Sequence, residues 1–300
     1  MENEQLKVYK HSGKVGLMGF GPIFMVVLGA LSLSLSIVYV LAIYLIPWVY
    51  ANFLITACFG VICGYAVGIG GKIGKVRNAP LYVLIGLAIG VSAVYCQWVV
   101  WIFVHSMREN LILEPSGILN YMSDVAVDGF WSIFRIPIKG KFLYAVWVIE
   151  GLMISVCSAG AAYGVLCSSP FCEDCGRWFG KKGNICIMPL EAIEEPERIR
   201  QELLAGDCST LLNLNMKDSF GDAYTKLEIS NCPSCFKFSL LSVISVTIQD
   251  SEDSEEEFED PVIAYLMITD PMFQRIMARY FPQPGVESQF DRSRLQAVHS

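Results

Sequence analysis

Four long apolar runs alternate with short polar segments over the first 167 residues of the chain. They cover residues 19–46, 51–71, 81–104 and 142–166. The first three runs contain no charged residue, and the fourth contains only Glu150. Each run exceeds the ~20 residues that a helix needs to cross a bilayer core, where backbone groups must hydrogen-bond within their own segment. The pattern therefore predicts an all-α membrane domain over residues 19–167, a bundle of four transmembrane helices.

Composition supports a membrane domain over the alternative, which is that these runs are core helices of a large soluble protein. Apolar residues make up 54% of the chain and charged residues 17%, where a soluble domain carries about 25% charge. The first run is also longer than the 7–15 apolar residues of a signal peptide. We therefore expect it to be a retained membrane helix.

Basic residues predict the orientation of this domain. They cluster in the N-terminal tail (residues 1–18), in the loop at 72–80 and just after the fourth run, whereas the turn at 47–50 has none. Because Lys and Arg favour cytoplasmic loops, both termini are expected in the cytoplasm, as an even number of spans requires. The expected location is the plasma (inner) membrane, with multiple passes. The loop at 105–141 would then be external. It weakens this prediction, because it contains Arg108, Arg135, Lys139 and Lys141.

The loop at 105–141 is amphipathic rather than simply polar. Glu114 and Pro115 are typical of a helix start, and Gly129 is typical of a helix end. The Trp and Tyr residues of this loop suit the headgroup layer of a membrane. We expect either an interfacial segment or a cap on the outer face of the bundle.

Small residues recur at four-residue steps within two of the apolar runs. They are Gly60, Gly64 and Gly68 in the second run, and Gly86 and Gly90 in the third. Such steps let helix backbones approach closely in lipid, where no hydrophobic force drives association. The glycines are predicted to pack helices within the bundle; a self-association face is the alternative.

Glu150 is a candidate intramembrane polar site. A carboxyl at this depth is costly unless it is paired, protonated or close to a wet cavity. The alternative is a position near the membrane interface, or a hydrogen bond to a neighbouring helix.

Two cysteine pairs of the form C-x-x-C follow the last apolar run: Cys172 with Cys175, and Cys232 with Cys235. Two such turns can direct four thiolates at one centre, which is the ligand set of a structural zinc ion. The chain has 11 cysteines, and this odd number argues against a fully paired disulfide framework. Three alternatives remain: replacement of one ligand by Cys186 or Cys208, a redox-active C-x-x-C pair, or an iron–sulfur centre.

Residues 168–281 are predicted to form a small cytoplasmic α+β domain that resembles a zinc ribbon in its cysteine turns and flanking strands. Strands are expected at 224–230, 236–248 and 261–268, and helices at 189–205 and 270–280. The acidic run at 251–260 is expected to be a solvated hairpin loop, and the tail at 282–300 to be disordered.

Charge limits the function classes. Residues 168–300 carry 12 Lys and Arg against 22 Asp and Glu, a net charge of −10, which disfavours nucleic acid. The expected partners are the lipid bilayer and a protein, or a second copy of the chain. The leading hypothesis is a binding, scaffold or assembly role through the zinc domain. The alternatives are a transporter, channel or transport accessory, and a membrane redox enzyme; His11, His105 and His299 are too dispersed to favour an enzyme.

Overall fold

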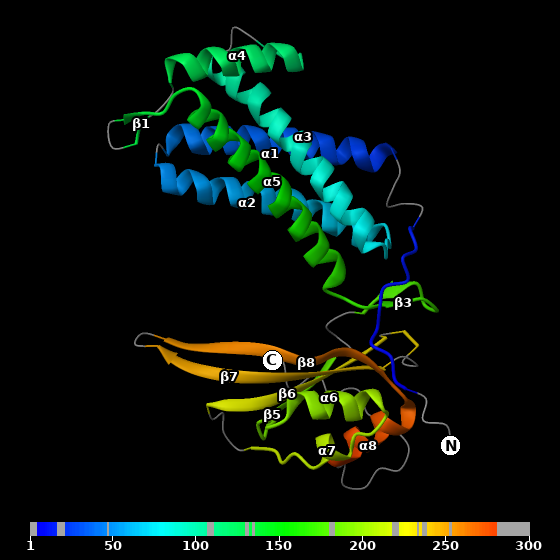
Figure 1. The fold of residues 1–300 in the computed structure, drawn as a ribbon. Coiled ribbons are helices and arrows are strands. Elements are labelled where there is room, and N and C mark those ends of the chain that lie inside the picture. Colours follow the sequence, from blue (N-terminus) through cyan, green and yellow to red (C-terminus); the bar gives the residue numbers. More distant parts are fainter. Residues whose placement is uncertain are drawn as a thin grey trace. The chain divides into compact units, whose positions relative to one another are not determined.

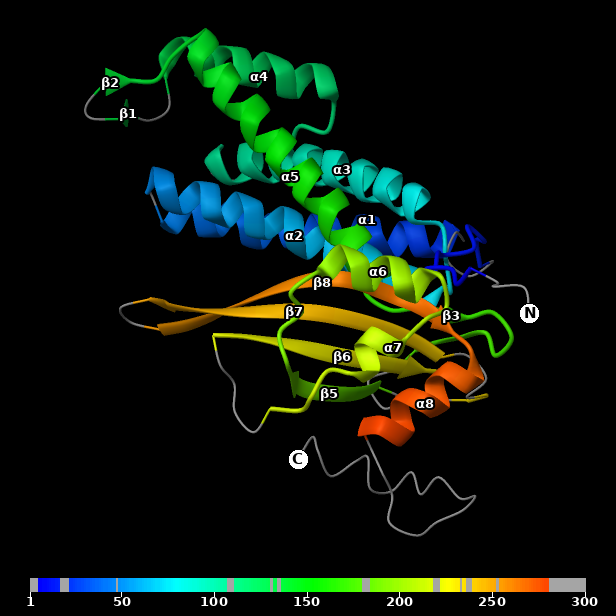
Figure 2. The same cartoon turned by 60° about the horizontal axis from the view of Figure 1, so that its bottom comes forward.

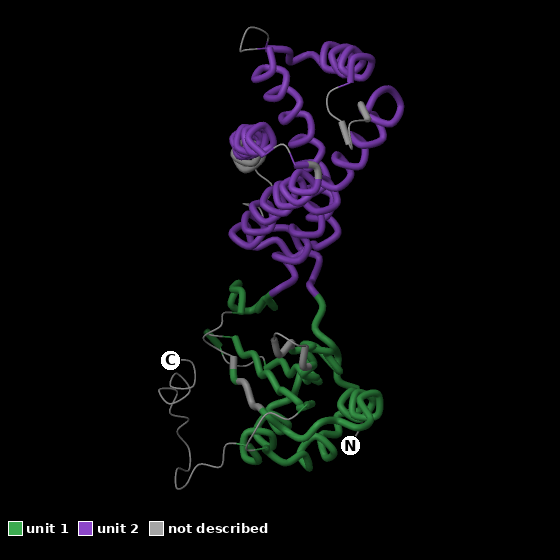
Figure 3. Tube along the Cα trace, turned by 90° about the vertical axis from the view of Figure 1, so that its left-hand side faces the viewer, with its two compact units in different colours: residues 1–10, 169–300 green, residues 11–168 purple. Residues whose placement is uncertain are grey.

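The chain forms two compact units, one of residues 11–168 and one that joins residues 1–10 to residues 169–300 (Figure 3). The computed structural model describes residues 5–16, 22–46, 48–106, 111–129, 132–133, 136–179, 184–217, 222–232, 234–235, 239–251 and 254–280. Within these ranges only the backbone is described for residues 22–28, 49, 132–133, 136–137, 184, 186–188, 250–251 and 254–256. The tail predicted to be disordered, 282–300, lies outside the described residues.

The first unit is helical, and its long helices lie side by side (Figure 1). They are α1 (Pro22–Leu45), α2 (Val49–Ile73), α3 (Ala79–His105) and α5 (Lys141–Cys167). Within the described residues, three segments are long and apolar enough to cross a membrane: Tyr50–Ile73, Ala79–His105 and Lys141–Cys167. In the first predicted span, residues 19–46, α1 runs over Pro22–Leu45, and Gly29–Leu45 is the apolar part of it whose side chains the structure describes.

Small residues set the helix packing of this unit. A side chain at Gly60 would meet Ile154, and one at Gly64 would meet Ser158, so α2 and α5 run in the same direction. Gly86 and Gly90 of α3 instead meet Ala159 and Ser155 respectively, so α3 runs antiparallel to α5. The Ser158 hydroxyl donates to the Gly86 carbonyl at 2.8 Å and joins α3 to α5. Every glycine predicted to pack helices therefore lies against α5.

The loop after α3 contains a helix, α4 (Pro115–Asp128). It begins with Pro115 at its first turn and ends at Gly129, whose φ of 80° favours glycine. Ile118 of α4 packs on Val99 and Ile102 of α3. A two-residue hairpin, β1 (Ser132–Ile133) and β2 (Ile136–Pro137), precedes α5.

The second unit contains an antiparallel sheet in the order β5-β6-β7-β8. Its strands are β5 (Asn184–Leu190), β6 (Ala223–Asn231), β7 (Ser239–Ser251) and β8 (Ser254–Ile268). Helices α6 (Pro196–Leu204), α7 (Ser209–Leu212) and α8 (Asp270–Tyr280) cover one face of this sheet (Figures 1 and 2). Buried apolar side chains from the sheet and the helices form the core between them, including Leu227, Val243 and Ile276.

This sheet differs from the predicted elements at two places. The helix expected over 189–205 is limited to α6, because residues 184–190 pair with β6 and Pro196 starts the helix at its first turn. The acidic run expected as a loop is largely strand: Glu255, Glu257 and Glu259 of β8 face Asp250, Ile248 and Val246 of β7. Cross-strand hydrogen bonds therefore extend into a segment whose composition indicates a loop.

The N-terminal tail belongs to this second unit. The backbone of Lys7 accepts from Met267, and Tyr9 donates to Tyr265, at 2.9 and 2.8 Å. Val8 forms an antiparallel bridge with Leu266 of β8. Because β8 is the last strand of the sheet, the tail covers an edge that would otherwise be open to pairing with another chain.

Candidate metal centre

The first cysteine pair lies on a short hairpin of β3 (Phe171–Cys172) and β4 (Arg177–Trp178). Gly176 closes its turn with a φ of 62°, and its N–H donates to the Cys172 carbonyl at 2.9 Å. A residue with a Cβ adopts this backbone conformation at a cost, so glycine suits the position. The turn places Cys172 and Cys175 at the same end of the hairpin.

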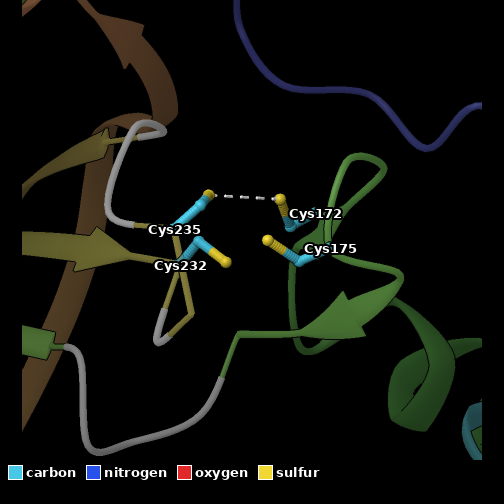
Figure 4. Close-up of side chains that lie close together, drawn as sticks. All are labelled: Cys172, Cys175, Cys232 and Cys235. Carbon is cyan, nitrogen blue, oxygen red and sulfur yellow. Dashed lines mark hydrogen bonds between the residues drawn. The ribbon is translucent and has the colours of Figure 1, made fainter.

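The second pair, Cys232 and Cys235, lies between the end of β6 and the start of β7. Figure 4 shows the side chains of both pairs directed at one another. The four Sγ atoms all lie within 4.8 Å of one another, and the Sγ atoms of Cys172 and Cys235 are 3.8 Å apart. The fold therefore brings together two pairs that are far apart in sequence.

These distances fit one tetrahedral metal ion. A Zn–S distance of about 2.3 Å gives about 3.8 Å between neighbouring sulfurs of a regular tetrahedron. A disulfide requires about 2.05 Å, and all four thiols are free. The group formed by Cys172, Cys175, Cys232 and Cys235 can thus hold a metal ion.

An apolar shell surrounds the four thiols. Cys172 and Cys232 are buried with Phe179 and Leu240, and the partly buried Tyr265 and Met267 of β8 pack on this cluster. Phe171 and Trp178 stack edge to face across the hairpin, 4.9 Å between ring centroids. Shielding of this kind restricts the access of water and competing ligands to a metal.

The N-terminal tail also supports the site. The Phe171 N–H donates to the Tyr9 hydroxyl at 3.0 Å, directly before Cys172 in the chain. Arg177 donates to the Ser234 hydroxyl at 3.4 Å and so connects the two cysteine turns. The sequence contains no signal for the role of Tyr9, because its contact with the hairpin spans 162 positions.

The thiols differ in acidity. Burial acts to raise the pKa of Cys232, but N–H groups of Cys235 and Ser234 donate to its sulfur and lower the pKa to about 7. The pKa of Cys175 is raised to about 12, first because of its hydrogen bond with Cys235. Burial is the main cause that raises the pKa of Cys172. A thiolate-binding metal must therefore displace protons as it binds.

The other cysteines of the chain lie elsewhere. Cys208, considered as an alternative ligand, is buried in the core between the sheet and its helices. The side chain of Cys186, the other alternative, lies outside the described residues. The free thiols of the helical unit are Cys58, Cys63, Cys96, Cys157 and Cys167.

Glu150 lies in the first half of α5 and is partly buried. It belongs to the helical unit, whereas the four thiols belong to the other unit. Comparison of the chain with protein-family models, with curated proteins and with solved structures finds no match.

Proposed function

We propose that this chain is an integral membrane protein whose soluble unit contains one structural zinc ion and binds a partner protein at the membrane surface. The observation that supports it best is the set of four clustered thiols. Four protein thiolates fill every position of a tetrahedral zinc ion, whereas a catalytic zinc keeps one position for water or substrate. The metal would therefore stabilise a fold rather than act on a substrate.

The proposed topology has four spans with both termini in the cytoplasm. Residues 5–10 hydrogen-bond to the unit of residues 169–300, which supports a common side of the membrane for the chain before α1 and the chain after α5. A common side implies an even number of crossings between them. The apolar α2, α3 and α5 give three, which supports α1 as the fourth. The parallel course of α2 and α5 agrees with this alternation.

The cytoplasmic side also suits the thiols. A reducing compartment keeps paired cysteines as thiols, available to a metal, rather than as disulfides. The 3.8 Å contact joins the Sγ atoms of Cys172 and Cys235, which belong to different C-x-x-C turns. A redox pair would join the two cysteines of one turn, so this contact supports a metal.

A protein partner is supported by the shape and charge of the β7–β8 hairpin. Among the described residues, β6 pairs with β7 as far as Thr247 and the Asp222 carbonyl accepts from the Ile248 N–H, whereas β7 and β8 stay paired up to Ser251 and Ser254. The hairpin tip thus extends past β6 as two strands, with Glu255, Glu256 and Glu257 on its β8 side. An acidic projection on a unit of net charge −10 favours a basic protein surface and disfavours nucleic acid.

The metal assignment is tested on full-length protein purified in mild detergent without chelator. We expect one zinc per chain, loss of zinc in Cys172→Ser, and full zinc content in the buried control Cys208→Ala. Limited proteolysis should then cut the soluble unit of Cys172→Ser while the helical unit stays in the membrane. Wild-type protein that contains no metal, or Cys172→Ser that retains it, would contradict the zinc site.

The binding role is tested separately by affinity purification of the same protein. Replacing Glu255, Glu256 and Glu257 by Gln should reduce the amount of a co-purifying protein, and replacing Glu194 and Glu197 near α6 should not. Equal recovery with both variants would contradict a role for the hairpin tip. Reporters fused after Ser300 and near Ser116 test the topology, with cytoplasmic and external signals expected respectively.

A further inference from the structure

The first residues of the helical unit lie against the turn between α2 and α3. The Gly13 N–H donates to the Arg77 carbonyl at 3.1 Å, and the Arg77 N–H donates to the Lys14 carbonyl at 2.8 Å. The side-chain amide of Asn78 donates to the Gly13 carbonyl at 3.1 Å, a contact that spans 65 positions. These three hydrogen bonds place Lys14 beside a turn that is distant in the sequence.

The turn itself places two further lysines at the end of α2. The Lys75 N–H donates to the Lys72 carbonyl at 3.1 Å, and the Val76 N–H donates to the Gly71 carbonyl at 2.9 Å. This pair of hydrogen bonds is the Schellman motif, in which the residue after the helix cap adopts a left-handed conformation. Lys75 occupies that position with a φ of 52°, where glycine fits without strain. The fold thus retains a lysine where the backbone favours glycine.

The end of α5 lies close to the end of α2. The Lys72 ammonium donates to the hydroxyl of Ser168, the residue directly after α5, at 2.8 Å. Lys14 and Lys75 are exposed, and Lys72 and Arg77 are half-buried. Four basic residues from two distant segments are therefore gathered at one end of the helical unit. We call Lys14, Lys72, Lys75 and Arg77 the basic surface.

The acidic residues of the helical unit come after position 108 in the chain. Glu114, Asp124 and Asp128 lie in α4 or next to it, and α4 follows the opposite end of α3. Glu150 is 18 residues before Ser168, about 27 Å along the axis of α5 at 1.5 Å per residue. Glu173, the first acidic residue after α5, belongs to the other unit. The carboxylates that the structure describes in the helical unit are therefore distant from the basic surface.

Apolar side chains are exposed beside these basic residues. Ile73, the last residue of α2, is 75% exposed, and Val15, which follows Lys14, is 43% exposed. The two stretches are in contact, because a Cβ at Gly16 would collide with the Gly74 carbonyl. Exposed apolar side chains next to basic ones suit the boundary between acyl chains and headgroups, where long basic side chains reach the phosphates. This combination favours a lipid over an anion dissolved in water.

We propose that the basic surface binds the phosphate of an anionic phospholipid headgroup. The ammonium groups of Lys14 and Lys75 and the guanidinium of Arg77 bind the phosphate. Val15 and Ile73 contact the acyl chains below it. Clusters of about 4–8 Lys and Arg residues directly outside a spanning helix are typical of such lipid recognition. The inference rests on the membrane insertion proposed above and adds the class of lipid that the protein prefers.

The test uses delipidated full-length protein in neutral detergent micelles, with either phosphatidylglycerol or phosphatidylcholine added. At ten times its Kd, phosphatidylglycerol should raise the melting temperature of the helical unit by about 4 °C, and phosphatidylcholine should have a much smaller effect. Inorganic phosphate at the same ionic strength should not reproduce the rise, because it leaves the apolar side chains exposed. A salt concentration of about 0.5 M should weaken the response by screening the charges.

Lys75→Gln removes one positive charge and should raise the Kd for phosphatidylglycerol about fivefold. The matched control is Lys139→Gln, which removes an exposed lysine next to α4, where the Gly140 N–H donates to the Ala126 carbonyl. It should leave the Kd unchanged. Lys75→Gly protects the test against misfolding, since glycine suits the left-handed position. This variant should be more stable than wild type without lipid, yet bind phosphatidylglycerol as weakly as Lys75→Gln.

Four outcomes would overturn the proposal: equal responses of wild type to the two lipids, an unchanged Kd in both Lys75 variants, an equal loss in Lys139→Gln, or a full response to inorganic phosphate alone. Extraction of membranes with alkaline carbonate checks insertion separately. Wild type that stays in the membrane but does not prefer phosphatidylglycerol refutes the lipid site and leaves the proposed membrane protein standing. Wild type released by carbonate refutes both.

Discussion

Gly64→Ala tests the close packing of α2 on α5. A Cβ at Gly64 would lie 2.7 Å from the carbonyl carbon and the Cα atom of Ser158, and closer still to the carbonyl oxygen. Ordinary carbon contacts are about 3.5–4.0 Å, so the helices must separate by roughly 1 Å. Backbone atoms cannot rotate aside as a flexible side chain can.

The expected loss of unfolding free energy follows from these contacts. Overpacking costs about 1–3 kcal/mol. Displacement of Ser158 also strains its hydrogen bond to Gly86, and such bonds are worth about 0.6 kcal/mol within membranes. We therefore expect Gly64→Ala to destabilise the helical unit by about 2 kcal/mol.

Gly164→Ala provides the matched control. It makes the same substitution in α5, where a Cβ would meet nothing within 4 Å. Alanine is the better helix former, so this variant should be neutral or slightly more stable. The two substitutions should thus shift stability in opposite directions.

The assay is reversible unfolding in mixed micelles with increasing SDS, followed by tryptophan fluorescence. Trp98 of α3 and Trp147 of α5 pack edge to face with centroids 5.0 Å apart, so their emission reports the separation of these helices. Equal unfolding midpoints for Gly64→Ala and Gly164→Ala would refute the reasoning, because the contact at Gly64 would then not be part of the folded bundle.

Three further predictions concern the unit of residues 1–10 and 169–300. Tyr9→Phe removes the acceptor of the Phe171 N–H, so zinc transfer to a chromophoric chelator should become several-fold faster than in wild type. Tyr280→Phe removes a buried hydroxyl 2.7 Å from the Leu211 carbonyl and should cost about 1 kcal/mol in chemical unfolding. Backbone and side-chain donors of Asn215 lower the pKa of Glu191 below its ordinary 4.5. The stabilisation that ionised Glu191 gives to the fold is present above pH 4.5 and is lost as the pH falls through the lowered pKa. Acid should therefore reduce the unfolding free energy of wild type more than that of Glu191→Gln.

The three helices that are long and apolar enough to cross a membrane are visible in the sequence alone, because the length and apolarity of a helix are local properties. The runs 51–71, 81–104 and 142–166 lie within the three segments long enough to cross a membrane. Alternation and helix-start signals likewise indicate β6, β7 and α8 within a few residues. The cysteine spacing likewise indicates four candidate ligands, since each C-x-x-C pair is a local turn.

Tertiary structure decided the features that join distant segments. Pairing with β7 turned the acidic run into a strand, because cross-strand hydrogen bonds outweigh the loop preference of its residues. Tyr9 contacts the β3–β4 hairpin because the N-terminal tail pairs with β8. A sequence shows which residues are costly to bury, but only the packed chain shows what surrounds them.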